Sequence, residues 1–274
     1  MPLPPDSHVH SEWSWDAPLG DMEQTCARAV ALGLPAIAFT EHLDHTVWRV
    51  PATAEPRLTA LAAPDGMLTP PSFDPAGYFD AIDRCRSRFP GLRILTGVEM
   101  GEPHWHAPAC AKVLAAGRFE RVLGSLHCLP DADGYSEPWA LYDHRDADDV
   151  IRSYLAGVAD MVATSDMFEV LAHIDYPVRS WPGVFDPADF EDEFRHALRA
   201  TASSGRALEL NTRIPLHTTI LTWWHEEGGE AITFGSDAHL PELVGHGFRE
   251  AAAMAEAHGF RPGRNLLDLW SRAN

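Results

Sequence analysis

Short apolar runs recur along this chain of 274 residues, and each ends in polar residues that can take part in chemistry. The runs are AIAFTEH (36–42), RILTGVEMG (93–101), RVLGSLHCL (121–129), FEVLAHIDY (168–176), RALELNTR (206–213) and AITFGSDAH (231–239). The opening stretch PLPPDSHVH forms a weaker seventh. Each run is nearly continuous in apolar character, which is expected of β-strands that are buried on both faces.

Helical patterns lie between these predicted strands. The first covers residues 21–33, where Asp21 and Gln24 have the spacing of a capping box and Gly33 ends the pattern. The others are predicted at 76–89, 146–165, 187–204, 217–228 and 247–259. Alternating strands and helices predict a parallel sheet, and about seven such units predict a closed α/β barrel of the TIM type. No glycine-rich phosphate fingerprint follows the first strand, so an open doubly wound sheet is less favoured.

The chain is predicted to form a single domain over residues 1–274. Residues 49–75 are rich in proline and alanine and show little periodicity. We expect this stretch to be a long loop between a strand and a helix, either a lid over a site or a mobile insertion.

The polar residues at the predicted strand ends are mostly histidines and carboxylates. In a parallel barrel these ends meet in one mouth, so residues far apart in sequence should converge there. They are His8, His10, His42, Glu99, His127, His173, Asp237 and His239. One such histidine is usually a hydrogen-bonded core residue, but eight residues in one register indicate metal ligands. Imidazole and carboxylate without thiolate suit zinc, manganese or iron, and so many ligands predict more than one ion, with Glu99 able to bridge two.

The composition narrows the possible partners and compartment. The formal charge is −19, and the 21 basic residues are all arginines except Lys112. Such an acidic surface disfavours nucleic acid and anionic membranes as partners. The sequence has no apolar run near about 18 residues and no signal segment, so we expect a cytoplasmic protein. The four cysteines lack CxxC spacing and are expected to be reduced.

The motifs at the strand ends resemble those of the polymerase and histidinol phosphatase (PHP) family. The matching stretches are HxH near the N-terminus, TEH (40–42), GVE (97–99), SLH (125–127), AHID (172–175) and GSDAH (235–239), in the family's order. The length and the single catalytic domain most resemble the histidinol-phosphatase branch. This resemblance implies a distorted (β/α)7 barrel with a trinuclear metal centre at the C-terminal ends of the strands.

Carried over residue by residue, the resemblance implies three ligand sets for two to three divalent ions. The first set is His8, His10, Glu99 and Asp237; the second is Glu99, His127 and His173; the third is Asp16, His42 and His239. Some relatives have histidine at position 16, and the carboxylate here should shift the metal preference towards manganese or iron. Glu41 stands where the family often has aspartate, and we assign it no ligand role.

The implied reaction is attack by a metal-bridging hydroxide on a small phosphate monoester, with L-histidinol phosphate as the expected substrate. Its products would be L-histidinol and phosphate, as in histidine biosynthesis. Besides the bridging Glu99, the catalytic candidates are Asp237 and His239, either of which could give a proton to the leaving alkoxide. A phosphate dianion also calls for an arginine, for which Arg213 is the first candidate and Arg179 the second.

Several alternatives remain open or are disfavoured. A carboxylated-lysine amidohydrolase also uses HxH, but Lys112 lies in a predicted helix and not at a strand end. A PHP-type phosphodiesterase or a promiscuous phosphatase on another small phosphoester stays possible, because the same metals cleave diesters. A non-catalytic metal-binding sensor is more remote, since the ligand set is intact. His104 and His106 in GEPHWH are predicted to belong to a solvated loop.

Overall fold

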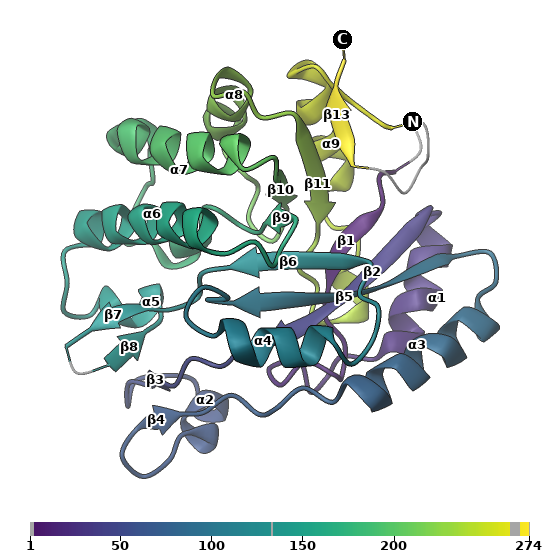
Figure 1. Ribbon diagram of the computed structural model, residues 1–274, viewed down its shortest axis with the longest axis horizontal. Coiled ribbons are helices and arrows are strands. Elements are labelled where there is room, and N and C mark those ends of the chain that lie inside the picture. Colours follow the sequence, from purple (N-terminus) through teal and green to yellow (C-terminus); the bar gives the residue numbers. More distant parts are fainter. Residues whose placement is uncertain (1–2, 133, 264–268, 274) are drawn as a thin grey trace.

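The computed structural model describes residues 3–132, 134–263 and 269–273. Among these residues, seven strands run parallel in the order in which they occur along the chain (Figure 1). They are β1 (Asp6–Val9), β2 (Ala36–Leu43), β5 (Arg93–Gly101), β6 (Arg121–Ser125), β9 (Val170–Leu171), β10 (Ala207–Asn211) and β11 (Ala231–Gly235). An antiparallel extension, β13 (Trp270–Arg272) and β12 (Phe260–Arg261), continues the sheet beyond β11.

The first strand returns to the last parallel strand. Val9 forms a parallel bridge with Ala238, and the backbone N–H of His10 donates to the Ala238 carbonyl at 2.9 Å. The N–H of Asp237 donates to the carbonyl of His8 at 2.8 Å. The pairing of β1 with β2 is irregular, and β9 has only two residues. The predicted distorted, TIM-like α/β barrel is therefore confirmed.

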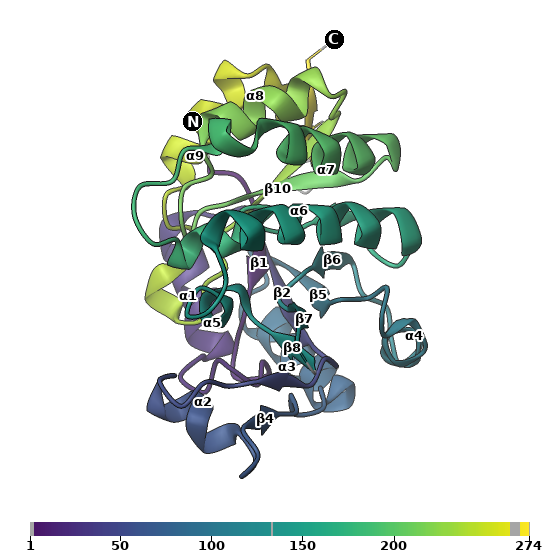
Figure 2. The same ribbon diagram turned by 90° about the vertical axis from the view of Figure 1, so that its left-hand side faces the viewer.

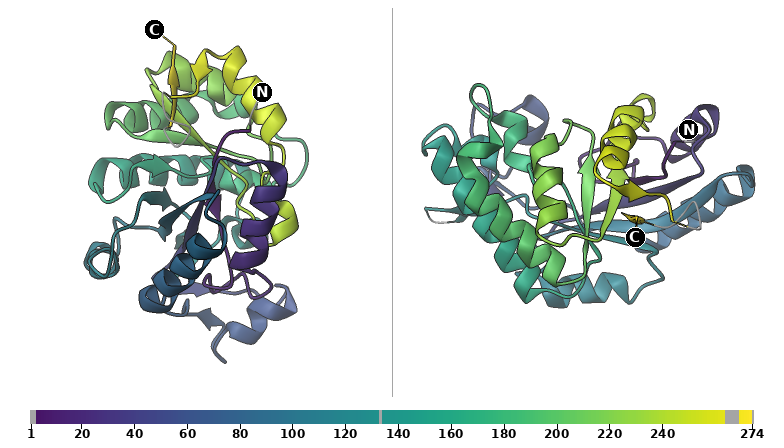
Figure 3. Two further views of the ribbon diagram at one scale, coloured as in Figure 1. Left: turned by 90° about the vertical axis from the view of Figure 1, so that its right-hand side faces the viewer. Right: turned by 90° about the horizontal axis from the view of Figure 1, so that it is seen from above.

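A helix follows each of the parallel strands in the described part of the chain. These helices are α1 (Met22–Leu32), α3 (Pro75–Arg88), α4 (Ala107–Leu114), α6 (Ala147–Thr164), α7 (Glu191–Ser203), α8 (Thr218–Glu226) and α9 (Phe248–Ala257). Helices α6 and α7 run side by side in Figure 2, and α1 and α9 lie on one side of the strands in the left panel of Figure 3. The six predicted helices are all present, each within a few residues of its expected bounds.

Local chemistry sets the ends of α1. The side chain of Asp21 accepts from the N–H of Gln24 at 2.8 Å, and Gly33 ends the helix with φ of 72°. This left-handed conformation costs glycine little. The Gln24 side chain bonds the Asp21 carboxylate and not its backbone, so the cap is simpler than the predicted capping box.

Two predicted strands are shorter than their apolar runs. The run 168–176 forms a strand only at Val170–Leu171, and Tyr176–Ser180 is a 3-10 helix, η1. Pro177 stands at the N-terminal end of this 3-10 helix, where a residue without an N–H is tolerated. The run 121–129 leaves the barrel after Ser125, and its last residue begins a separate hairpin.

Small elements gather beyond the C-terminal ends of the strands (Figure 1). The hairpin consists of β7 (Leu129–Asp131) and β8 (Gly134–Ser136), followed by α5 (Pro138–Leu141). The stretch 49–75 contains α2 (Pro56–Leu61) and β4 (Met67–Leu68), which pairs with β3 (Trp48–Arg49). Two more 3-10 helices are η2 (Pro187–Phe190) and η3 (Pro241–Leu243). The stretch 49–75 is thus not a plain loop, although its role as a lid stays a prediction.

The interior of the barrel wall is apolar. On α6, for example, Tyr154, Leu155 and Val158 are buried against the core, and each such side chain stabilises the fold by roughly 1.5–3 kcal/mol. The four cysteines are free and buried, as predicted. None of the helices in the described ranges is long and apolar enough to cross a membrane.

Candidate metal centre

Glu99 lies at the centre of the predicted ligands. Its Oε1 is 2.6 Å from Nε2 of His173 and 3.1 Å from Nε2 of His127. Its Oε2 is 3.1 Å from Nε2 of His8 and 3.3 Å from Nε2 of His10. The C-terminal ends of the parallel strands converge at one mouth of the barrel, which is why sequence positions 91 residues apart meet here.

The protonation of two of these rings tests whether a cation fits. Nδ1 of His8 lies 2.6 Å from a Glu209 carboxylate oxygen, which can only accept, so Nδ1 carries the proton. Nδ1 of His10 lies 2.9 Å from Oγ of Ser14, whose own proton goes to Glu41 at 2.6 Å. When the two rings are neutral, both Nε2 atoms therefore keep their lone pairs.

These two Nε2 atoms are only 3.0 Å apart. Oε2 of Glu99 and Oδ1 of Asp237 face the same point, the latter at 3.5 Å from the His10 nitrogen. Four acceptor atoms thus converge without a donor between them, an arrangement that a metal cation satisfies.

The electrostatics of the cluster agree with this reading. Burial opposes protonation of His8, but Glu209, Glu99 and Asp237 outweigh it and raise its pKa well above the ordinary value. Burial, together with the neighbouring His42 and His239, lowers the pKa of His10 to about 4. Clustered carboxylates thus draw positive charge to this point, while the ring of His10 stays neutral, the form in which histidine binds metals.

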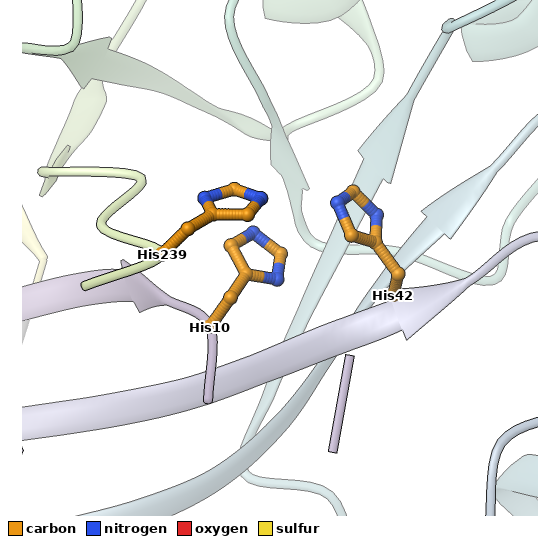
Figure 4. A group of neighbouring side chains, drawn as sticks. All are labelled: His10, His42 and His239. Carbon is orange, nitrogen blue, oxygen red and sulfur yellow. The ribbon is translucent and has the colours of Figure 1, made fainter. Parts of the chain in front are cut away.

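A second group of rings lies beside the first (Figure 4). His10 is 4.3 Å from His42 and 4.3 Å from His239 between ring centroids, and all three point toward one another. Oδ2 of Asp16 is 3.0 Å from Nε2 of His239 and 3.4 Å from Nε2 of His42. The other oxygen of Asp16 is buried and has no hydrogen-bond partner among the described residues.

The structure therefore brings all nine predicted ligands into one cluster. Groups that could hold an ion, with ligand atoms within 4.8 Å of one another, are His10/His42/His239, His8/Glu99/His173, His8/His10/Asp237 and His42/Asp44/His127. These groups combine residues from different predicted ligand sets, for example His42 of the third set with His127 of the second. The assignment of each residue to a particular ion stays a prediction.

Glu209 is a member of the site that the sequence did not reveal. Besides His8, it accepts the backbone N–H of His173 at 2.8 Å, so one buried carboxylate orients two predicted ligands. A side chain at Gly235 would leave no room for it, because a Cβ there would lie 1.9 Å from Oε1 of Glu209. The signal was present in ALEL, where Glu209 is the single charge within an apolar run.

Asp44, two residues beyond His42, was also missed. Its Oδ2 is 3.4 Å from Nδ1 of His42, and its Oδ1 is 3.3 Å from Nδ1 of His127. The indole of Trp15 donates to it at 2.8 Å, which fixes the carboxylate. Asp44 can either orient these two rings or serve as a ligand. Glu41, by contrast, accepts hydrogen bonds from the hydroxyls of Ser11 and Ser14 and from the backbone N–H of Ser11.

Both predicted arginines lie at the cluster and contact Asp237. Nη2 of Arg179 is 2.5 Å from Oδ2 of Asp237, and Nη1 of Arg213 is 3.5 Å from its Oδ1. Burial is outweighed by Arg179 and then His8, so the pKa of Asp237 lies well below its ordinary value. Asp237 is therefore a poor proton donor, which favours His239 of the two predicted candidates.

A cavity of about 950 Å³ opens at the cluster. Its lining includes Glu99, His173, Asp237 and both arginines, together with residues of the small elements such as Trp48, Trp139 and Glu137. Water and a small molecule can therefore reach the ligand atoms from a partly aromatic pocket.

A family model described as the PHP domain matches residues 6–213 of the chain. The chain belongs to the PHP domain family. The matched segment covers most of the barrel and carries the predicted ligands from His8 to His173.

Curated PHP relatives match nearly the whole chain. "Histidinol-phosphatase" of Lactococcus lactis subsp. lactis (strain IL1403) is 26% identical over 266 residues, which cover 93% of this chain and 91% of that protein. "Probable histidinol-phosphatase" of Deinococcus radiodurans is 29% identical over 256 residues, 90% of each chain. A crystal structure of the Lactococcus lactis histidinol phosphate phosphatase, complexed with zinc, L-histidinol and phosphate, gives a TM-score of 0.79 at 24% identity and covers 97% of this chain and 98% of that one.

Other features of this PHP chain lie outside the cluster. Lys112 is exposed on α4, so it cannot provide the bridging carbamate of an amidohydrolase site. Nε2 of His106 is 2.9 Å from Oγ1 of Thr46, and Nε2 of His104 is 3.9 Å from Asp160. Neither histidine belongs to a metal-capable group found among the described residues.

Proposed function

We propose that this protein is a metal-dependent phosphatase that hydrolyses a small phosphate monoester, L-histidinol phosphate, to L-histidinol and phosphate. One observation carries the proposal. Both oxygens of Glu99 face imidazole nitrogens, and two arginines stand beside this cluster at the mouth of the same cavity. Cation ligands and phosphate-binding groups thus share one pocket.

Two to three divalent ions, zinc, manganese or iron, would be held by His8, His10, Asp16, His42, Glu99, His127, His173, Asp237 and His239. Such ions supply Lewis-acid charge for the phosphoryl oxygens and for activating water. The nitrogen and oxygen donors suit all three metals, and Asp16 adds an oxygen that favours manganese or iron.

The chain's own groups would bind and orient the ester. Arg179 is held by Asp237 and Asn211 with its guanidinium toward the cavity, where it can bind a phosphate oxygen. Arg213 is more exposed and can bind a second oxygen. The ring of His239 is partly exposed, and its Nδ1 lies 3.2 Å from Nη1 of Arg213. This residue would give the proton that the leaving alkoxide needs.

Similarity supports the choice of substrate. The Lactococcus lactis relative has the name histidinol-phosphatase and aligns over more than nine tenths of both chains. The likeness to the solved structure concerns the fold, and the zinc, L-histidinol and phosphate belong to that protein. On the same grounds we propose that the binding partner is a small phosphorylated metabolite and that the protein works in the cytoplasm.

Phosphodiester hydrolysis is the second candidate, because the same metals cleave diesters and the cavity at the cluster has a volume of about 950 Å³. One experiment separates the two. The protein, purified without chelator, is analysed for bound metals. Phosphate release is then measured with L-histidinol phosphate, an aryl phosphate and a bis-aryl diester, and the Glu99→Ala variant is run in parallel.

Two to three metals per chain, fastest turnover of L-histidinol phosphate and an inactive Glu99→Ala variant are the expected results. Cleavage of the diester in preference to either monoester would replace the proposed reaction with the second candidate. Absence of both metal and hydrolysis would overturn the proposal as a whole.

A further inference from the structure

The cavity carries a carboxylate that the proposed chemistry does not use. Glu137 immediately precedes α5 and lines the wall of the cavity together with Trp139 and Tyr176. Its position before the helix would suit a capping side chain, yet it makes no such hydrogen bond. Instead the carboxylate turns toward the cavity.

Only one oxygen of Glu137 is occupied within the described part of the chain. Oε2 accepts from the indole of Trp139 at 2.8 Å and from the hydroxyl of Tyr176 at 2.9 Å. Oε1 has no partner there, and no arginine, lysine or histidine of those residues forms an ion pair with the group. Two donors thus hold the carboxylate in place. His127 acts on its charge from a distance, but the two groups form no ion pair.

Tyr176 links this carboxylate to the metal centre. Its ring lies 5.3 Å from His127 and 5.0 Å from His173 between centroids, and its hydroxyl reaches Glu137. The guanidinium of Arg179 lies 4.9 Å from the same ring. The cavity therefore has arginine side chains near the cluster and, hydrogen-bonded to the hydroxyl of Tyr176, the carboxylate of Glu137.

We propose that Glu137, fixed by Tyr176 and Trp139, is a specificity-determining residue that binds the cationic end of the substrate, an ammonium or imidazolium. The pocket fits a phosphate ester whose cation stands a few bonds from the ester oxygen. Burial raises the pKa of Glu137, and a bound cation would offset that rise by favouring the ionised carboxylate. Trp139 and Trp48, which pack edge to face with ring centroids 6.4 Å apart, also line the cavity, and an aromatic face attracts organic cations.

This subsite rests on the proposed phosphatase function but not on its exact substrate. It predicts discrimination between two primary alkyl phosphates that differ in charge alone, ethanolamine phosphate and 2-hydroxyethyl phosphate. The metal-loaded protein should prefer the ammonium ester by roughly 10- to 100-fold in kcat/KM, the effect of one charge-assisted hydrogen bond. L-histidinol phosphate should be preferred over the neutral ester in the same way.

The test substitutes Glu137→Gln, which keeps the size of the side chain and an acceptor for Tyr176 and Trp139. The expected result is that the preference for the ammonium ester falls to within about threefold of unity, since the charged partner is gone. Glu55→Gln is the matched control, because Glu55 also lines the cavity, is exposed and makes no capping bond. It should keep the wild-type preference. The thermal midpoint of each variant verifies that it is folded.

Each result is decisive. A preference that is unchanged in Glu137→Gln, or absent from the wild type, overturns the subsite even if L-histidinol phosphate is hydrolysed. If the ammonium ester is preferred in the wild type alone while L-histidinol phosphate is untouched, the subsite stands and the proposed substrate falls. Without any turnover, calorimetry with L-histidinol decides: weaker binding to Glu137→Gln supports the subsite, and equal binding overturns it.

Discussion

The Glu209 carboxylate lies 2.6 Å from Nδ1 of His8, on the side of the ring opposite to Glu99. This contact fixes the tautomer that leaves Nε2 free to bind a metal. It spans 201 positions of sequence, from β10 to β1. The orientation of the first predicted ligand is therefore a property of the assembled barrel and not of the HxH motif.

Removal of this contact should weaken metal binding. In Glu209→Gln the side chain keeps its size, but its amide can present N–H to Nδ1 of His8 and so disturb the tautomer. We expect metal affinity to fall by about 10- to 100-fold, measured by competition with a chromogenic chelator. Glu230→Gln, at an exposed position, is the control. Equal affinity in both variants would show that Glu209 has no influence on the ligands.

The two arginines should differ in their effect on phosphate binding. Arg179 is mostly shielded, with 17% of its side chain exposed, whereas Arg213 is 48% exposed and more strongly screened by solvent. Inhibition by inorganic phosphate should weaken by roughly 10- to 100-fold in Arg179→Met and by roughly 3- to 10-fold in Arg213→Met. Arg249→Met on α9 is the exposed control. A larger loss for Arg213 than for Arg179 would contradict this order.

Chelation should lower thermal stability. An ion that binds only the folded state stabilises it by about 4 kcal/mol when free metal is about 1,000-fold above its Kd. For a domain of this size, that corresponds to a shift of roughly 10 °C in the unfolding midpoint. Calorimetry before and after chelation, with metal restored in a third scan, measures it. Glu99→Gln should show a much smaller shift, and an identical shift would argue against binding at this cluster.

Away from the site, the ion pairs between α7 and the end of α8 should contribute to the free energy of unfolding in a way that depends on pH. Arg195 bonds Glu227 at 2.9 Å and Glu226 at 2.6 Å. Burial is outweighed by Arg199 and Arg195, so the pKa of Glu227 is below its ordinary value of 4.5. A lowered carboxylate pKa stabilises the fold above the unfolded-state value, and this contribution is lost as pH falls through the folded-state pKa.

Arg195→Gln should therefore cost roughly 0.5–1 kcal/mol in the free energy of unfolding at neutral pH, and less in high salt. At a pH below the folded-state pKa of Glu227 the cost should largely vanish, because the carboxylate is then protonated. Urea unfolding at both pH values checks this. A cost that is the same at both would assign it to lost packing on Trp223, whose ring lies 5.5 Å from the guanidinium.

Much of the fold followed from the sequence because its signals are local. Apolar runs, caps and glycines mark where each element begins and ends, and parallel strands can close in few ways. Eight of the nine predicted ligands followed for a related reason: each stands at or just beyond a strand end, and barrel geometry brings strand ends together whatever loop lies between them. Asp16, in the loop between β1 and α1, followed instead from the resemblance to the PHP family.

The residues that were missed depend on contacts across the barrel. Nothing near Glu209 in sequence points to His8, and Asp44 acquires its role only when β2 lies beside the residues that follow β6. The sequence of residues 49–75 is typical of a loop because the helix and strands of this stretch are short and are stabilised by distant partners. Leu68, for example, packs with Trp48 and Cys128. Periodicity needs longer elements than these.

The seam between β1 and β11 also bears on how the protein is made. His8 and His10 leave the ribosome before the rest of the barrel, whereas Asp237 and His239 follow the last parallel strand. Until β11 is synthesised, the early histidines have no carboxylate partner on that side and β1 has no second neighbour. Synthesis of one late strand therefore completes both the barrel and the metal centre, and a nascent chain that stops short of it carries most of the ligands without a site.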